Sequence, residues 1–279
     1  MTDLNKIRQT AQKDNVTTAL VFKEHVQLVI LEYLFRKGLF SKLVFQGGTA
    51  LRLAYQGVRY SEDLDFVLKQ KDEDVFRNLG EQLHPLASHV KKLVPMITGA
   101  QLKAQKETDT FQRYCLIIEA DFLNAKDKTN IEIVNVPSHE HHTVMIRHPE
   151  LALAPAVTVE TAREILSDKI VAFAAREYIK GRDLWDVFFI MKTLNVSIDP
   201  RVFSMVKSKI KDYQLSERDF PRLLEEKTEH LKKDGVRILH EEMDRFLPAS
   251  YRDIYLSQYP DICGFERSVF LEVAEGLKK

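Results

Sequence analysis

The stretch "VFQGGTALRLAYQGVRYSEDLDFVL", residues 44–68, decides how we expect this chain to fold. Just before the Gly-Gly pair, "KLVFQ" at 42–46 predicts a short strand, which the glycines stop. The run "TALRLAYQG" at 49–57 predicts a helix that Gly57 ends. The alternating "DLDFVL" at 63–68 predicts a second strand.

Gly47 and Gly48 lie where the first strand would pass into the helix. Such a junction presents backbone N–H groups at a helix N-terminus, and these groups attract phosphate. Glycine lets the backbone approach a ligand closely and adopt positive φ. Thr49 would cap the helix or contact the bound anion. A plain turn is the alternative interpretation of the pair.

Asp63 and Asp65 are the chemically informative part of the second strand. Alternate side chains of a strand share one face, so the two carboxylates would lie roughly 6–7 Å apart along it. Leu64 and Phe66 would point to the opposite face and into a core. Neighbouring carboxylates that lose water repel each other unless a cation balances them. Hard oxygen ligands suit Mg²⁺, so we expect a metal site here.

A third carboxylate from a neighbouring strand would complete this site. Glu132 in "NIEIVN" is the best candidate, with Glu119 and Asp121 in "LIIEADF" as rivals. A solvated face of an edge strand is the alternative for Glu132. A phosphate-binding turn and paired acids, separated by one helix, are what metal-dependent nucleotidyl transfer needs.

Composition places few constraints on function. The chain has 279 residues, with 41 basic and 41 acidic side chains, so its formal net charge is zero. A nucleic-acid partner would therefore have to meet a local patch. The N-terminus lacks the apolar core of a signal peptide, no apolar run is long enough to span a membrane, and Cys115 and Cys263 are expected to be free thiols. We expect a cytoplasmic protein with no membrane association.

The predicted elements change character near Pro155. Residues 1–155 mix helices and strands, whereas residues 156–279 predict helices and turns, so we expect an α+β half followed by a helical half. The first half has a helix at 17–40, an amphipathic helix at 71–90, and strands at 111–122, 129–136 and 142–146. The second half has helices at 158–179, with Thr158 or Thr161 as the cap, and at 181–194.

Two motifs resemble those of the AbiEii-type toxins, a nucleotidyltransferase-like family that includes the MenT toxins. The first is "GGTALRLAYQGVRYSEDLDFVL" at 47–68, and the second is "EILSDKIVAFAAREYIKGRDLWDVFFI" at 164–190. The second motif is similar to a family helix with a lysine, followed by an Arg-Asp-aromatic-x-Asp helix start. It supplies Lys169, Arg182, Asp183 and Asp186.

The resemblance implies a polymerase β-like nucleotidyltransferase core, with a mixed sheet flanked by helices. It implies a helical C-terminal domain that contributes Lys169 and Asp183 to the cleft. It also implies Mg²⁺ or Mn²⁺, a nucleoside triphosphate, an RNA acceptor such as the tRNA 3′ end, and a cognate antitoxin. Within this resemblance the candidate site residues are, for catalysis, Asp63, Asp65, Lys169 and Asp183; for the nucleotide, Gly47, Gly48, Thr49, Ser61 and Lys169; and for the metal, Asp63, Asp65 and Glu132.

Several of these residues have a plain structural alternative. Lys169 shares a helix face with Ile165 and Phe173, where it would neutralise a triphosphate or serve as an ordinary boundary lysine. Asp183 and Asp186 lie one turn apart at a helix start, where carboxylates are favoured by the helix dipole. Ser61 would either meet a phosphate or cap the start of the strand.

The acceptor is the least determined part of the prediction. The stretches 89–106 and 207–222 are rich in cations and could follow an RNA backbone, or could simply be solvated surface. His139, His141 and His142 in "SHEHHT" lack the further ligands of a zinc site, so we expect a polar loop there. Transfer to a protein or a small molecule, or nucleotide binding without catalysis, are the alternative functions.

Overall fold

The opening stretch folds into strand, helix and strand, as predicted. The structure is a computed structural model of the chain, and it describes residues 3–148, 151 and 153–278. Strand β1 (Leu43–Gln46) runs into helix α3 (Gly47–Ala54), and β2 (Leu64–Leu68) returns antiparallel beside β1. The chain divides into two compact units, residues 1–160 and 161–279, where the sequence places the boundary near 155.

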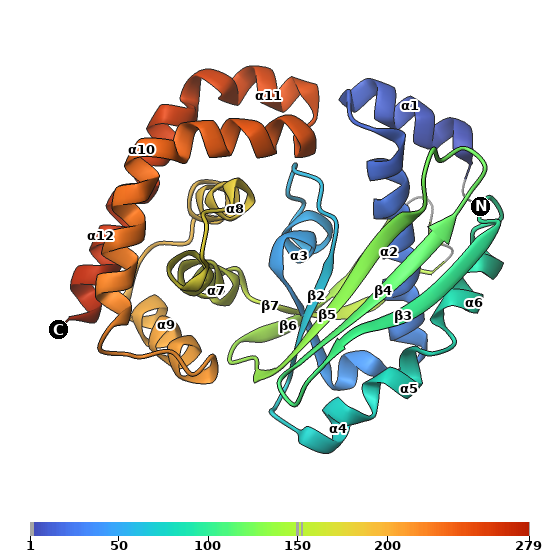
Figure 1. Cartoon of the computed structure of the whole chain (residues 1–279), viewed down its shortest axis with the longest axis horizontal. Coiled ribbons are helices and arrows are strands. Elements are labelled where there is room, and N and C mark those ends of the chain that lie inside the picture. Colours follow the sequence, from blue (N-terminus) through green and yellow to red (C-terminus); the bar gives the residue numbers. More distant parts are fainter. Residues whose placement is uncertain (1–2, 149–150, 152, 279) are drawn as a thin grey trace. The chain divides into compact units, whose positions relative to one another are not determined.

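Strand β2 lies in the middle of a seven-stranded mixed sheet formed by the described residues of the first unit (Figure 1). The strand order is β3-β4-β5-β2-β1-β7-β6. β2 is parallel to β5 and β1 is parallel to β7, whereas the other neighbours are antiparallel. The remaining strands are β3 (Gly99–Glu107), β4 (Phe111–Glu119), β5 (Asp127–Pro137), β6 (His141–Met145) and β7 (Ala156–Glu160). The α+β prediction is confirmed.

Strands β3 and β7 were missing from the sequence prediction, for two different reasons. β3 is an edge strand with no buried residue, so it has no apolar alternation to reveal it. β7 is short and directly precedes a helix, with which the prediction merged it. Thr161 caps that helix by accepting from Glu164 N at 3.2 Å. Thr158 lies inside β7, where its hydroxyl donates to the Phe40 carbonyl at 2.9 Å.

The first unit is built around helix α2 (Thr18–Arg36), which is buried without interruption from Leu20 to Leu34. A helix surrounded on all sides belongs to a core, and α2 packs against α1 (Leu4–Asp14), α6 (Leu86–Leu93) and β5. The single helix predicted at 71–90 is wrong. The chain forms α4 (Glu73–Arg77), α5 (Leu79–Leu83) and α6 there. Pro85, which has no N–H to continue a helix, separates α5 from α6 and precedes the first residue of α6.

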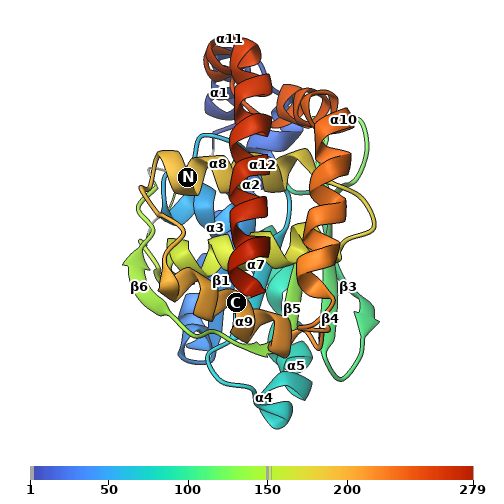
Figure 2. The ribbon, with the colours of Figure 1, turned by 90° about the vertical axis from the view of Figure 1, so that its left-hand side faces the viewer.

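The second unit contains only helices and turns among residues 161–278, as predicted. They are α7 (Ala162–Ala175), α8 (Gly181–Lys192), α9 (Pro200–Asp212), α10 (Phe220–Phe246), α11 (Ala249–Tyr255) and α12 (Tyr259–Leu277). Helix α12 runs beside α10 (Figure 2). Phe173 of α7 stacks on Phe270 of α12 with ring centroids 4.0 Å apart. Across the described segments, every helix is too short or too polar to cross a membrane.

Candidate active site

The Gly-Gly pair forms the junction between β1 and α3. Gly47 has a φ of +76°, a left-handed conformation that favours glycine. A Cβ atom at Gly47 would lie 2.6 Å from Asp65 Oδ2, so the absent side chain leaves the space that this carboxylate occupies. The Asp65 carboxylate is therefore held against the start of α3, where the helix dipole favours negative charge.

Three more residues of the first motif gather at the start of α3. The Thr49 hydroxyl donates to the Asp63 carbonyl, which ties the helix to the residue before β2. Thr49 is fully buried, and the N-cap residue of α3 is Gln46, so the predicted Thr49 cap is not formed. A Cβ atom at Gly48 would collide with the Arg59 guanidinium and lie 3.2 Å from Ser61 Oγ. Ser61 therefore lies directly beside the glycine turn.

One face of the sheet carries the predicted carboxylates, and we call it the carboxylate face. Asp65 on β2 is the register partner of Glu132 on β5, and Glu132 is the register partner of Arg113 on β4. Register partners on neighbouring strands point to the same face and lie about 4.8 Å apart. Leu64 and Phe66 are fully buried on the opposite face. The structure thus brings Asp65 and Glu132 together from strands far apart in the sequence.

Each of the other carboxylates on this face has an identified neighbour. Asn130 Nδ2 donates to Asp63 Oδ1 at 2.9 Å, and Arg113 Nε donates to Glu132 Oε1 at 2.8 Å. Sequence reasoning missed both Asn130 and Arg113. The only sequence signal for Asn130 was strand alternation, because Asn130 lies two residues before Glu132 and therefore on the same face of β5.

The rivals of Glu132 lie elsewhere in the sheet. Glu119 ends β4, opposite Gly99 of β3, and forms an ion pair with Lys126 at 2.5 Å. Asp121 follows in the turn after β4. The register places Glu119 six residues along β4 from Arg113, the neighbour of Glu132. Geometry therefore favours Glu132 as the third carboxylate.

The donor atoms on the carboxylate face fit a divalent cation. Asp63, Asp65 and Glu132 offer hard carboxylate oxygens, the ligands that Mg²⁺ and Mn²⁺ prefer. All three side chains are partly exposed, so an ion can reach them. Arg113 forms an ion pair with Glu132 at 2.8 Å. A bound cation would offset the repulsion between carboxylates held close together.

Helix α2 and its neighbours brace the segment that leads into Asp63. Arg52 of α3 pairs with Glu24 of α2 at 2.6 Å and donates to the carbonyls of Gly57 and Val58 at 3.1 and 3.0 Å. Gln27 of α2 donates to the Ser61 carbonyl at 3.1 Å. These bonds fix the backbone on which Ser61 and Asp63 are carried.

The second motif forms a separate charged cluster within the helical unit. Lys169 of α7 pairs with Asp183 and Asp186 of α8, at 2.7 Å in each case. Arg176 also pairs with Asp183. The Lys169 side chain is only 12% exposed. The structure thus brings Lys169, Asp183 and Asp186 together, and it adds Arg176, to which sequence reasoning gave no role.

Further cations lie near this cluster. Burial lowers the pKa of Lys180, and the nearby positive charges of Arg176 and Arg182 lower it further. Arg182 Nε lies 3.3 Å from Glu242 of α10, and its guanidinium packs over the Phe246 ring. Cations gathered in this way are suited to an anionic ligand as well as to holding two helices together.

Two of the weaker sequence signals have a structural explanation. Lys209, in the cation-rich stretch 207–222, is fully buried between Glu164 at 2.7 Å and Asp168 at 2.9 Å. It belongs to the core of the helical unit and is not a surface cation. The histidines of "SHEHHT" divide between a turn and β6, with His139 in the turn and His141 on the strand. Ser138 Oγ and His141 Nδ1 lie 3.2 Å apart.

Comparison with known proteins identifies the family. The family model described as "Nucleotidyl transferase AbiEii toxin, Type IV TA system" matches residues 29–258. A solved structure titled "putative nucleotidyltransferase from H. pylori" is similar to this chain with a TM-score of 0.55 and 19% identity, covering 94% of this chain and 99% of its own. JHP933 from Helicobacter pylori has a TM-score of 0.52 and 18% identity, covering 94% and 96%.

At these identities the two structures show a shared fold, which confirms the predicted nucleotidyltransferase core. Curated protein sequences give no significant match. The family model spans most of the chain and includes both motifs. This protein belongs to the AbiEii family of nucleotidyl transferase toxins of type IV toxin–antitoxin systems.

Proposed function

We propose that this protein transfers a nucleoside monophosphate from a nucleoside triphosphate to RNA, at the 3′ end of tRNA, and thereby blocks translation. The reaction depends on Mg²⁺ or Mn²⁺, and a cognate antitoxin restrains it. The observation that carries the proposal is the register of the sheet, which places Asp65 beside Glu132 on the face that Asp63 also reaches.

The residues of the first unit suggest a division of roles. Asp63, Asp65 and Glu132 would hold the cation, which when bound supplies charge neutralisation for the triphosphate and for the leaving pyrophosphate. The N–H groups of Gly47 and Gly48 and the Ser61 hydroxyl would bind phosphate oxygens. The acceptor hydroxyl oxygen would release its proton to solvent and form a bond to the α-phosphorus as the bond to pyrophosphate breaks.

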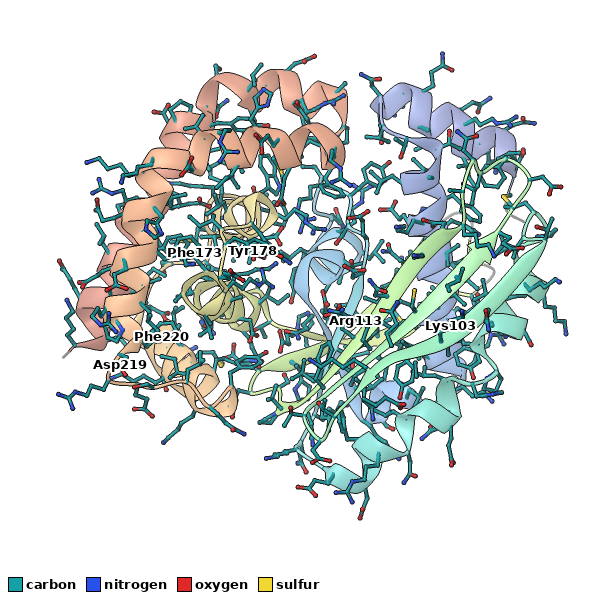
Figure 3. The ribbon with its side chains drawn as sticks, in the orientation of Figure 1. Lys103, Arg113, Phe173, Tyr178, Asp219 and Phe220 are labelled. Atoms are coloured by element: carbon teal, nitrogen blue, oxygen red, sulfur yellow. The ribbon has the colours of Figure 1, made fainter. Side chains whose placement is uncertain are left out.

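The carboxylate face continues into a row of cations that suits a nucleic-acid acceptor. Lys106 on β3 is the register partner of Arg113, and Lys103 is the register partner of Cys115, which pairs with Asn130. Figure 3 labels Lys103 and Arg113 on this sheet. At about 4.8 Å per strand, Lys106 lies roughly 15 Å from Asp65 across the sheet. Such a row can follow a phosphate backbone that ends at the carboxylates.

An aromatic ring within this row adds a surface for stacking. Phe111 shares the face with Arg113, and its ring lies 5.4 Å from the Arg113 guanidinium and 5.5 Å from Lys106 Nζ. Aromatic side chains between cations bind single-stranded nucleic acid by stacking on its bases. This arrangement favours RNA over a protein or a small molecule as acceptor.

Lys169 and Asp183 stay catalytic candidates on the strength of the family motif. Their mutual ion pair also stabilises α7 against α8, so loss of activity alone would not distinguish the two roles. Lys169→Arg keeps the charge and is expected to retain stability. If Lys169 contacts the triphosphate, this variant should raise KM for the nucleotide. An unchanged KM and kcat would assign the cluster a structural role.

The proposal is tested by supplying total tRNA, Mg²⁺ and each α-labelled nucleoside triphosphate in turn, followed by a denaturing gel. We expect label in tRNA with the wild type and none with Asp63→Ala, which should remain folded because it removes one of several repelling carboxylates. Label in protein instead of RNA would refute the proposal that RNA is the acceptor. Label in neither would favour a nucleotide-binding protein without catalysis. An active Asp63→Ala protein would refute the assigned site.

The cation row predicts a further property of the reaction. Replacing Lys103 and Lys106 by glutamine should raise KM for tRNA and weaken its dependence on salt, because fewer counterions are then released on binding. Replacing Lys91 and Lys92, at the end of α6, is a matched control in the same basic stretch. Equal effects of the two pairs would argue against a specific track on the carboxylate face.

A further inference from the structure

A cavity of about 430 Å³ opens between α1 and α2 in the first unit. Its lining includes Lys6, Thr10 and Lys13 from α1, and Glu24 and His25 from α2. None of the residues that line it belongs to the candidate active site. The cavity is therefore separate from the candidate active site.

The wall of the cavity is rich in positive charge and hydrogen-bond donors. Lys6 and Lys13 lie seven residues apart on α1, so they share one face of that helix. The imidazoles of His25 and His148 also line the cavity, and His25 is 4% exposed. Among the described residues of the lining, Glu24 is the one acid, and both of its carboxylate oxygens accept hydrogen bonds from Arg52, at 2.6 and 3.2 Å. Its negative charge is thus already balanced.

The lining also has an apolar part. The side chains of Ile7 and Val21 reach the cavity from α1 and α2 and are otherwise buried. Pockets for small molecules combine such apolar walls with a few polar groups, over volumes of roughly 300–1,000 Å³. Lysine and imidazole N–H groups are strong donors to phosphate oxygens.

We propose that this cavity binds a small phosphate monoester of mononucleotide size. The lysines and histidines take the phosphate, and Ile7 and Val21 contact the remainder of the molecule. This second site shares no residue with the carboxylate face, so the proposal does not depend on the proposed transfer reaction.

The position of the cavity links it to the first motif. Glu24 in the wall holds Arg52, and Arg52 holds the carbonyls of Gly57 and Val58 ahead of Asp63. The Tyr60 hydroxyl donates to Asp14, the residue after Lys13, at 2.6 Å. A ligand that stabilises α1 against α2 therefore also stabilises the supports of this segment.

Isothermal titration of the full chain with AMP tests the proposal, with adenosine as the uncharged control. We expect AMP to bind and adenosine to bind far more weakly. Lys13→Gln should weaken AMP binding about tenfold, since one charge-assisted hydrogen bond is lost. Arg8→Gln is the matched control, because Arg8 is an exposed cation of the same helix that does not line the cavity.

AMP could also occupy the candidate nucleotide site, and a further variant separates the two. Asp65→Asn alters the carboxylate face and leaves the cavity untouched, so AMP binding to the cavity should be unchanged in this variant. Equal AMP affinity of Lys13→Gln and the wild type would overturn the proposal. So would the absence of AMP binding, or its loss in Asp65→Asn but not in Lys13→Gln.

Discussion

Substitution of Gly47 by alanine separates backbone strain from the position of the Asp65 carboxylate. Gly47 and Gly38 both have positive φ, +76° and +68°. A methyl group at Gly47 would lie 2.6 Å from Asp65 Oδ2, whereas one at Gly38 would have no heavy atom within 4 Å. Gly38→Ala is therefore a control with the same backbone penalty and no collision.

The structure predicts different effects on stability and on activity. Alanine in a left-handed conformation costs about 1–2 kcal/mol, so both variants should lose that much free energy of unfolding. The nearest atom that a methyl group would meet at Gly47 is the tip of a side chain, which can rotate away, and the contacts of 3.3 Å to Asp65 Cβ and Cγ require a shift of only a few tenths of an ångström. That rotation moves the carboxylate by about 1 Å, and misplacement on this scale reduces catalysis on the order of 100-fold.

Urea unfolding measures the first effect, and Mg²⁺-dependent transfer of label measures the second. We expect the two variants to agree in stability within about 1 kcal/mol and to differ in transfer rate by about two orders of magnitude. If Gly47→Ala transfers label at the rate of Gly38→Ala, the position of Asp65 does not matter for the reaction and the reasoning fails.

Three predictions concern the buried ionisable groups. Lys209→Met should destabilise the protein by about 3–5 kcal/mol in urea, because the buried carboxylate of Glu164 and the partly buried one of Asp168 lose their cation. The exposed Lys207→Met should change stability little, and equal losses would contradict this account. Burial raises the pKa of Glu266 well above 4.5, so the folded state retains a proton that the unfolded chain loses. Stability should therefore fall by up to about 1.4 kcal/mol per pH unit above pH 4.5 until the folded-state pKa is passed, and urea titrations should show that Glu266→Gln lacks this fall. Burial raises the pKa of Cys263 to about 12 and also raises the pKa of Cys115. A thiol reagent at pH 8 should therefore label neither cysteine until urea is added. Fast labelling of the native protein would show that these thiols are accessible.

The first motif could be predicted from the sequence because its signals are local. The motif consists of a Gly-Gly pair between a strand and a helix, followed by alternating acids and apolar residues. These features determine the local fold of a single strand–helix–strand unit. β1, α3 and β2 accordingly form where the sequence predicts them. The helical second half was predictable for the same reason, since its apolar residues recur with helical spacing.

The partners of the carboxylates could not be predicted, because they depend on strand order and register. Nothing in the sequence shows that β5 lies beside β2 or that Arg113 faces Glu132. Lys209 shows a second limit of prediction from the sequence. It looks like a solvated cation in a basic stretch, yet the packing of α7 against α9 buries it against two carboxylates.

The central claim is that the carboxylate face performs metal-dependent nucleotidyl transfer. Pyrophosphate release from each nucleoside triphosphate, in the presence of total tRNA and Mg²⁺, measures it most directly. We predict release by the wild type that is abolished by chelation and by Asp65→Asn, and that persists in Asp74→Asn, which neutralises an exposed carboxylate on α4 of the same unit. Release by Asp65→Asn at the wild-type rate would contradict the claim.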